Sequence, residues 1–142
     1  MIAIGSDHGG YELKCEIIKH LESRKLEYKD FGTFSDASCD YPDIAKPVAK
    51  AVAAGECENG ILVCGTGIGI SIAANKVPGI RAALCSDCFS AQACREHNDA
   101  NILALGGRVL GTGLALKIVD TFLDTPFSND PRHIRRISKI ED

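Results

Sequence analysis

Short apolar runs alternate with longer amphipathic stretches along almost the whole chain. The apolar runs are rich in Ile, Val, Leu and Ala, as are strands that are covered on both faces of a parallel sheet. Such alternation is typical of βαβ units, in which a helix connects two strands. The sequence therefore predicts an α/β fold with one five-stranded parallel sheet, whose strands lie near residues 1–6, 26–31, 60–65, 80–85 and 102–106.

The amphipathic stretches place their apolar residues at the spacing of one helix face. The first such stripe, Leu13–Leu21, predicts a helix over 10–24. A second stripe follows Pro42, and proline suits the first turn of a helix. We expect residues 1–142 to form one domain, with later helices at 68–76, 87–97, 111–124 and 131–140.

Composition and charge narrow the class of protein. The 142 residues are 45% hydrophobic and 25% charged, which is usual for a folded globular domain. The formal net charge is −3, and the basic residues are scattered except near the C-terminus, which argues against a nucleic-acid partner. No apolar stretch is long enough to span a bilayer, and the first residues resemble a strand and not a secretory leader. We therefore expect a cytoplasmic protein with no membrane partner.

Seven cysteines are an odd number, which cannot pair completely within one chain. Reduced thiols fit a cytosolic protein, and most free cysteines fill small spaces in a core. Cys85 and Cys88 form a Cys-x-x-Cys pair, with Cys94 and His97 as potential further zinc ligands. Only five residues separate Cys88 from Cys94, whereas zinc modules separate their ligand pairs by roughly 12–20 residues. We therefore expect structural thiols here, no metal and no cofactor.

Glycine-rich polar segments follow three of the predicted strands. They are Ser6–Gly10, Cys64–Gly69 and Gly106–Arg108. Ligands of open α/β sheets bind beyond the carboxyl ends of the strands, where the strand order reverses. We therefore expect these three loops to converge on one rim that forms the functional site.

The turn Cys64–Gly69 is the most informative of the three. Its glycines let a ligand approach the backbone, and the free N–H groups of the following helix point back toward Cys64. A thiol beside a helix N-terminus ionises readily and is a competent base or nucleophile. The turn matches neither the dinucleotide fingerprint nor a P-loop, so no nucleotide is implied. The alternative interpretation is a tight structural turn.

Two polar pairs have both a structural and a chemical interpretation. Asp7 and His8 stand between a strand and a helix, where an aspartate commonly caps the helix. A carboxylate and an imidazole at a strand end can also orient each other and bind sugar hydroxyls. His97 and Asn98 close a helix and are potential C-caps. We nevertheless expect His97 near the rim, where an imidazole suits proton transfer.

The last predicted helix carries a basic stripe opposite an apolar one. Arg132 and Arg136 are four residues apart and therefore share a face. Two guanidinium groups on one face can hold a phosphate through charge-assisted hydrogen bonds. A phosphorylated small substrate would explain the pair, and the alternative is a solvated surface.

Taken together, these motifs resemble the B-type ribose 5-phosphate isomerases over essentially the whole chain. The resemblance implies a Rossmann-like three-layer α/β/α sandwich and a homodimer or a dimer of dimers. It also implies metal-free interconversion of ribose 5-phosphate and ribulose 5-phosphate. The segments that carry it are Ser6–Gly10, Asp40–Pro42, Cys64–Lys76, Gly79–Ala82, His97–Asn101 and Gly107–Arg108.

The same resemblance implies roles for individual residues. Cys64 is similar to the base that moves a proton between C1 and C2, and Thr66 and His97 to helpers that open the furanose ring. Amides of the 65–71 turn would stabilise the enediolate, and each site would be built from two subunits. Substrate contacts are implied for Asp7, His8, Tyr41, Gly65, Gly67, Ile68, Gly69, Ser71, Asn98, Arg108, Arg132 and Arg136, with His133 nearby.

Ile70 occupies the place where some family members have a glutamate base, which leaves Cys64 as the base here. Related galactose 6-phosphate isomerases share the glycine turn but use paired unlike subunits. Two alternatives stay open. One is an isomerase of a six-carbon sugar phosphate such as allose 6-phosphate, which needs a longer pocket. The other is a non-catalytic module that binds a sugar phosphate or a nucleotide, in which Cys64 would be dispensable.

Overall fold

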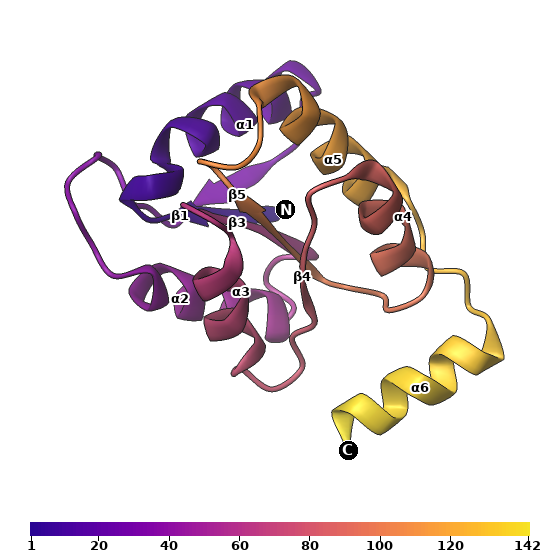
Figure 1. Ribbon diagram of the computed structural model, residues 1–142. Coiled ribbons are helices and arrows are strands. Elements are labelled where there is room, and N and C mark those ends of the chain that lie inside the picture. Colours follow the sequence, from indigo (N-terminus) through magenta and orange to yellow (C-terminus); the bar gives the residue numbers. More distant parts are fainter.

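A five-stranded parallel sheet runs through the computed structural model, which describes residues 1–142 (Figure 1). Its strands lie in the order β2-β1-β3-β5-β4, and every pair of neighbours is parallel. The two edge strands have three residues each and are shorter than the sequence predicts. The strands are β1 (Ile2–Ser6), β2 (Tyr28–Asp30), β3 (Asn59–Cys64), β4 (Ala82–Leu84) and β5 (Ile102–Gly106).

The helices follow the strands in the predicted alternation. A 3-10 turn, η1 (His8–Gly10), precedes α1 (Tyr11–Ser23), and Pro42 lies in the first turn of α2 as predicted. Asp87 and Asp130 cap the helices that follow them. The remaining helices are α2 (Tyr41–Ala53), α3 (Ile68–Asn75), α4 (Cys88–Glu96), α5 (Thr112–Asp124) and α6 (Pro131–Glu141).

The sheet divides the core into two layers, because successive strand side chains point to opposite faces. Ile4 and Leu103 pack with the apolar side chains of α1 and α5 on one face. Ala3 and Leu62 pack with those of α2 and α3 on the other. Figure 1 shows these helix pairs on either side of the strands. The predicted three-layer sandwich is thus confirmed.

The strand order reverses between β1 and β3. From β1 the chain crosses to β2 through α1 on one face, and from β3 it continues through α3 on the other. The loops that follow these two strands therefore open onto the same crevice at the carboxyl edge of the sheet.

The last helix, α6, differs from the others in that none of its residues is buried. It extends away from the sheet in Figure 1. Its apolar side chains Ile134 and Ile140 are 49% and 60% exposed. An ion pair of 2.8 Å between Arg81 Nη1 and Glu141 Oε1 ties its end to the body. No helix of the chain has the length and apolar character needed to cross a membrane.

Candidate active site

The loops that follow β1, β3 and β5 meet at the carboxyl edge of the sheet, as the sequence predicts. The amide of Gly107 donates to the carbonyl of Cys64 at 2.8 Å, and the amide of Asp7 donates to the carbonyl of Val63 at 3.2 Å. These bonds join the loops through peptide groups alone. The rim is therefore held in place independently of the side chains that a ligand would contact.

Two glycines permit this close approach. A Cβ at Gly10 would lie 2.5 Å from the carbonyl atoms of Val63, and one at Gly107 would lie 2.9 Å from the carbonyl oxygen of Gly9. Because backbone atoms cannot yield as a flexible side chain can, only glycine fits at these positions. The glycine pairs Gly9–Gly10 and Gly106–Gly107, near the ends of two strands, were the sequence signal for this contact.

Cys64 is the last residue of β3, and its side chain is nearly buried, with 5% exposed. The amide of Gly67 donates to Cys64 Sγ at 3.1 Å. Gly67 is the N-cap of α3 with a φ of 80°, a left-handed conformation that favours glycine. The turn thus directs an N–H group at the sulfur. Because the N-cap residue is a glycine, no side chain caps the first turn of α3. This arrangement offers a backbone hydrogen-bond donor to the sulfur and leaves further N–H groups of α3 free for an atom bound beside it.

The side chains around the turn support its shape. Thr66 Oγ1 accepts a hydrogen bond from the amide of Ile68 at 3.2 Å, and Ser71 Oγ donates to the carbonyl of Ile68 at 2.8 Å. Thr66 is exposed, whereas Ser71 is 8% exposed and its hydroxyl proton is already used. Thr66 is therefore the hydroxyl of this turn that can face a ligand.

Tyr41 reaches the same turn from the start of α2. A Cβ at Gly69 would lie 2.6 Å from Tyr41 Cζ and 2.9 Å from its hydroxyl oxygen. The ring therefore packs directly on the backbone of Gly69, and 39% of Tyr41 stays exposed. Tyr41 and the glycine turn therefore lie against each other at this side of the rim.

Asp7 and His8 lie on the β1 side of the rim. The Asp7 carboxylate accepts a hydrogen bond from the amide of Gly10 at 3.2 Å, so it caps the turn that leads into α1. His8 Nδ1 accepts one from the amide of Cys39 at 3.2 Å. His8 lines a hollow of about 240 Å³ together with Gly9, Glu12, Leu13, Asp36, Gly107 and Arg108.

Arg108 places a cation at this hollow. Its amide donates to the carbonyl of Gly65 at 2.9 Å, which fixes the start of the side chain. A Cβ at Gly65 would lie 3.3 Å from Arg108 Nη1, so the guanidinium group lies over the glycine turn. Arg108 is the basic side chain that the rim itself offers to an anion.

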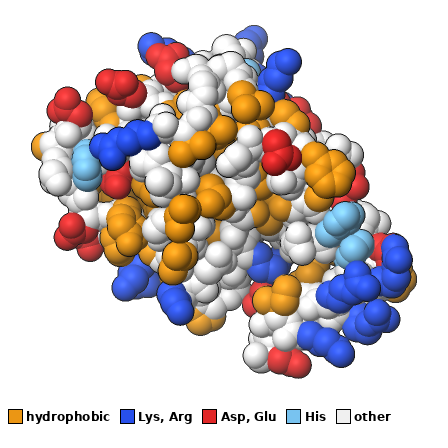
Figure 2. All heavy atoms as spheres, viewed as in Figure 1, with side chains coloured by type: hydrophobic (Ala, Val, Ile, Leu, Met, Phe, Trp, Pro, Cys, Tyr) orange, Lys and Arg blue, Asp and Glu red, His pale blue; other side chains and the backbone are white.

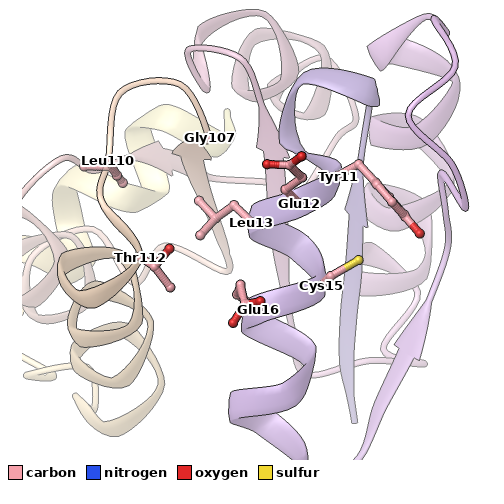
Figure 3. A pocket seen from close by; sticks show the side chains of 8 residues that line it. All are labelled: Tyr11, Glu12, Leu13, Cys15, Glu16, Gly107, Leu110 and Thr112. Carbon is pink, nitrogen blue, oxygen red and sulfur yellow. The ribbon is translucent and has the colours of Figure 1, made fainter.

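A second hollow of about 420 Å³ opens between α1 and the start of α5. Figure 3 shows Leu13 pointing from α1 toward the segment with Leu110 and Thr112. The carboxylates of Glu12 and Glu16 line this hollow. Glu12 lines both hollows, and the basic side chain Arg108 lines only the smaller one.

The other predicted site residues lie elsewhere in the chain. His97 is the C-cap residue of α4, a helix that begins soon after β4 ends and runs back along the sheet. The carbonyl of Asn98 accepts from Arg81 Nε at 2.9 Å, just before β4 begins. A helix that follows a strand in a parallel unit ends at the amino edge of the sheet, opposite Cys64. The prediction that His97 lies near the rim of its own chain is therefore wrong.

The basic residues of α6 lie beside His97 and not beside the rim. The His97 and His133 rings stack with centroids 4.5 Å apart and an angle of 20° between their planes. Figure 2 shows the basic side chains of α6 gathered next to these imidazoles. Within one chain, the structure thus forms two groups of predicted site residues.

Arg132 already has a partner within its own helix cap. Its Nη2 lies 3.0 Å from Asp130 Oδ2, and this guanidinium lowers the pKa of Asp130 to about 2. Arg136, one turn further along, is exposed and makes no ion pair within the chain. Arg136 is therefore the freer of the two cations for binding an anion.

Lys14 is a residue that the sequence reasoning missed. Its side chain is fully buried, with Nζ 2.8 Å and 3.0 Å from the two carboxylate oxygens of Asp30 and a further hydrogen bond to the carbonyl of Thr33. This cation holds the segment after β2 against α1. A lysine next to Leu13, on the inner face that Ile17 continues, was the available signal.

The cysteines are mostly structural. All seven are free, four are buried, and Cys85 Sγ lies 4.0 Å from Cys94 Sγ, not beside Cys88. The neighbouring sulfur and burial together raise the pKa of Cys85. No group of three or more His, Cys, Asp or Glu side chains is arranged to hold a metal ion.

The sheet and its thiol-bearing rim are those of an α/β protein with a candidate active site at the carboxyl edge of a parallel sheet. Comparison with known proteins makes this more specific, because the profile of the Ribose/Galactose Isomerase family matches residues 2–140. The chain belongs to this family, which confirms the resemblance found in the sequence.

Individual relatives agree with the family. The chain is 54% identical to a putative sugar phosphate isomerase of Bacillus subtilis, covering 99% of this chain and 95% of the relative. It is 53% identical to ribose-5-phosphate isomerase B of Escherichia coli, with 98% and 93% covered. Among solved structures, ribose-5-phosphate isomerase B of Clostridium thermocellum has a TM-score of 0.97 at 60% identity, with 99% and 94% covered.

Proposed function

We propose that this chain interconverts ribose 5-phosphate and ribulose 5-phosphate as an aldose–ketose isomerase, with residues 1–142 acting as one catalytic domain. The observation that carries the proposal is the nearly buried Cys64 thiol at the end of β3, 3.1 Å from the amide of Gly67. Family membership and the names of the relatives support the choice of substrate.

The chemistry needs a base and a site for negative charge on oxygen. The Cys64 thiolate takes the proton from C2 of the open-chain aldose, and the electron pair of that bond forms the C1–C2 double bond. Charge moves to O1, where the amides at the start of α3 stabilise it. The thiol then returns the proton to C1 while the O2 hydroxyl proton moves to O1, which leaves the ketose carbonyl on C2.

A furanose must open before this step. We assign the transfer of a proton between O1 and the ring oxygen to the hydroxyl of Thr66, an exposed residue in the same turn as Cys64. We assign the second proton carrier to His97, an exposed imidazole. Because His97 lies at the opposite edge of its own sheet, it must come from another copy of the chain.

We therefore propose that the active site is shared between two chains. One chain contributes the rim with Cys64, His8 and Arg108. The other contributes His97, Asn98, Arg132 and Arg136, which lie together at the far edge of the sheet and on α6. The half-exposed apolar side of α6 supports this arrangement, because a second chain would cover it.

The phosphate would bind between Arg108 of the rim and Arg136 of the other chain. Arg132 would hold Asp130 and so keep the start of α6 in position. We also propose a reducing, cytoplasmic location, since all seven thiols are free and two buried sulfurs lie 4.0 Å apart without a bond.

The test is a comparison of Cys64→Ala and Cys64→Ser with Cys57→Ala, a matched loss of another buried cysteine in the same core layer. We expect both Cys64 variants to lose at least about 10³-fold in kcat, while ribose 5-phosphate still binds and Cys57→Ala stays active. Measurable rates with allose 6-phosphate, assayed alongside, would reveal a longer substrate. Full turnover by Cys64→Ala would refute the cysteine base.

A further inference from the structure

His8 is the rim imidazole whose hydrogen bonding is defined within a single chain. Its Nδ1 accepts a hydrogen bond from the backbone amide of Cys39 at 3.2 Å. The ring is partly buried and lines the 240 Å³ hollow together with Arg108 and Asp36. This single contact decides which chemistry the other ring nitrogen can offer.

A backbone N–H group can only donate, so Nδ1 must keep its lone pair. In a neutral imidazole the single proton then lies on Nε2. His8 consequently faces the hollow as a hydrogen-bond donor and not as a base. The ligand atoms that such a donor recognises are the hydroxyl, ring and phosphate oxygens of a sugar phosphate.

The segment that supplies the Cys39 amide is anchored at both ends. At its start, the amide of Ser6 donates to Gly32 at 2.7 Å, the amide of Thr33 donates back to Ser6, and Lys14 binds Asp30. At its end, Asp40 precedes α2 without a side-chain cap, and its carbonyl accepts a hydrogen bond from the amide of Asp43 at 3.1 Å. Residues 34–38 between these anchors are exposed. The amide is therefore held at a fixed place relative to the rim, which pre-organises the ring that it contacts.

We propose that His8 is a donor-only contact for the sugar phosphate, presenting Nε2–H, and that the segment 31–40 positions it through the Cys39 amide. This inference rests on the proposed function only for the identity of the ligand. The tautomer itself is a property of the free protein. Cys39 is thereby a positioning residue that acts through its backbone.

The first test is a long-range nitrogen–proton NMR correlation spectrum of the full, uniformly ¹⁵N-labelled chain. The chain has four histidines, and a spectrum of His8→Gln identifies the signals of His8 by their loss. We expect Nδ1 to resonate as an unprotonated nitrogen and Nε2 as a protonated one. The reverse pattern in the wild-type chain would overturn the proposal, whether or not the chain isomerises ribose 5-phosphate.

Variants of Cys39 test the positioning. Cys39→Pro removes the backbone N–H group and the thiol, whereas Cys39→Ala removes the thiol and keeps the N–H group. We expect the proline variant to show mixed His8 tautomers and a KM about tenfold higher, with kcat much less affected. The alanine variant should match wild type in both. Unchanged tautomer and KM in a folded proline variant would remove the segment 31–40 from the proposal.

Variants of His8 separate the two ring nitrogens without changing the backbone. His8→Asn keeps an acceptor near the Nδ1 position and lacks the outer donor, while His8→Gln offers a donor near the Nε2 position. We expect the KM of His8→Asn to be about fivefold to tenfold higher than the KM of His8→Gln, which should stay near the wild-type value. If His8→Asn is the better variant, the outer nitrogen is not the contact. Loss of kcat in both at unchanged KM would indicate a base instead.

Discussion

The rim at the carboxyl edge differs in construction from the α6 group, which consists of His97, Asn98 and the helix α6. The rim is joined by backbone hydrogen bonds and by glycines that no other residue can replace. The α6 group has no buried residue and is held by one ion pair and one pair of stacked imidazoles. The rim is formed within a single chain, whereas the α6 group leaves its cations and apolar side chains exposed.

This difference agrees with the proposal that one chain carries two halves of a shared site. A rim that must place a thiol and amides around a reacting carbon needs a rigid frame. Side chains that hold the phosphate or pass a proton at the ring oxygen can stand on an exposed helix, provided that a second copy fixes them. The following predictions test that division.

The largest expected effect comes from combining two inactive chains. Cys64→Ala removes the base of the rim, and His97→Ala removes an imidazole of the α6 group. Each variant alone therefore lacks one half of every shared site and should be inactive. When the two are unfolded and refolded together, hybrid dimers contain one intact site, and we expect about a quarter of wild-type activity. The measurement is the rate of ribose 5-phosphate isomerisation against mixing ratio. No recovery at any ratio would place the whole site within one chain.

The sequence predicts the rim well because its parts are local. Strand, cysteine, glycine turn and helix are consecutive in Cys64–Lys76, so their geometry follows from neighbouring residues. The predicted position of His97 was wrong because it depends on the direction in which α4 runs. The alternation of strands and helices already implied that α4 runs back to the amino edge of the sheet. Lys14 and Asp30 are 16 residues apart, and their pairing depends on tertiary packing that no local pattern encodes.

Lys14→Met tests whether the frame of the rim depends on its buried cation. Removing one partner of a buried ion pair leaves the carboxylate of Asp30 unpaired, and we expect a loss of about 3 kcal/mol in the free energy of unfolding. The control is Lys19→Met, whose pair with Glu16 is exposed and should contribute less than about 0.5 kcal/mol. Urea unfolding at one fixed protein concentration gives both values. Equal losses would show that Lys14 has no special role.

Arg136→Ala tests the α6 group without touching the frame. Because a phosphate is remote from the reacting carbons, losing its cation should raise KM about tenfold or more and leave kcat within a few-fold. Arg135→Ala is the control, since Arg135 is an exposed arginine of the same helix and its removal changes the net charge by the same amount. Steady-state kinetics on both variants decide the matter. A fall in kcat at constant KM would contradict phosphate binding by Arg136.

His133 gives the smallest expected effect, because it acts on His97 through stacking alone. The two rings lie 4.5 Å apart, and an aromatic pair contributes about 0.5–1.5 kcal/mol beyond its buried area. Replacing His133 by Ala frees the His97 ring, and we expect kcat to fall about threefold to fivefold. His133→Phe keeps a flat ring in place and should retain most of the rate. If the two variants lose the same fraction of kcat, His133 contributes through its nitrogens. The α6 group would then bind the substrate through His133 as well as Arg136.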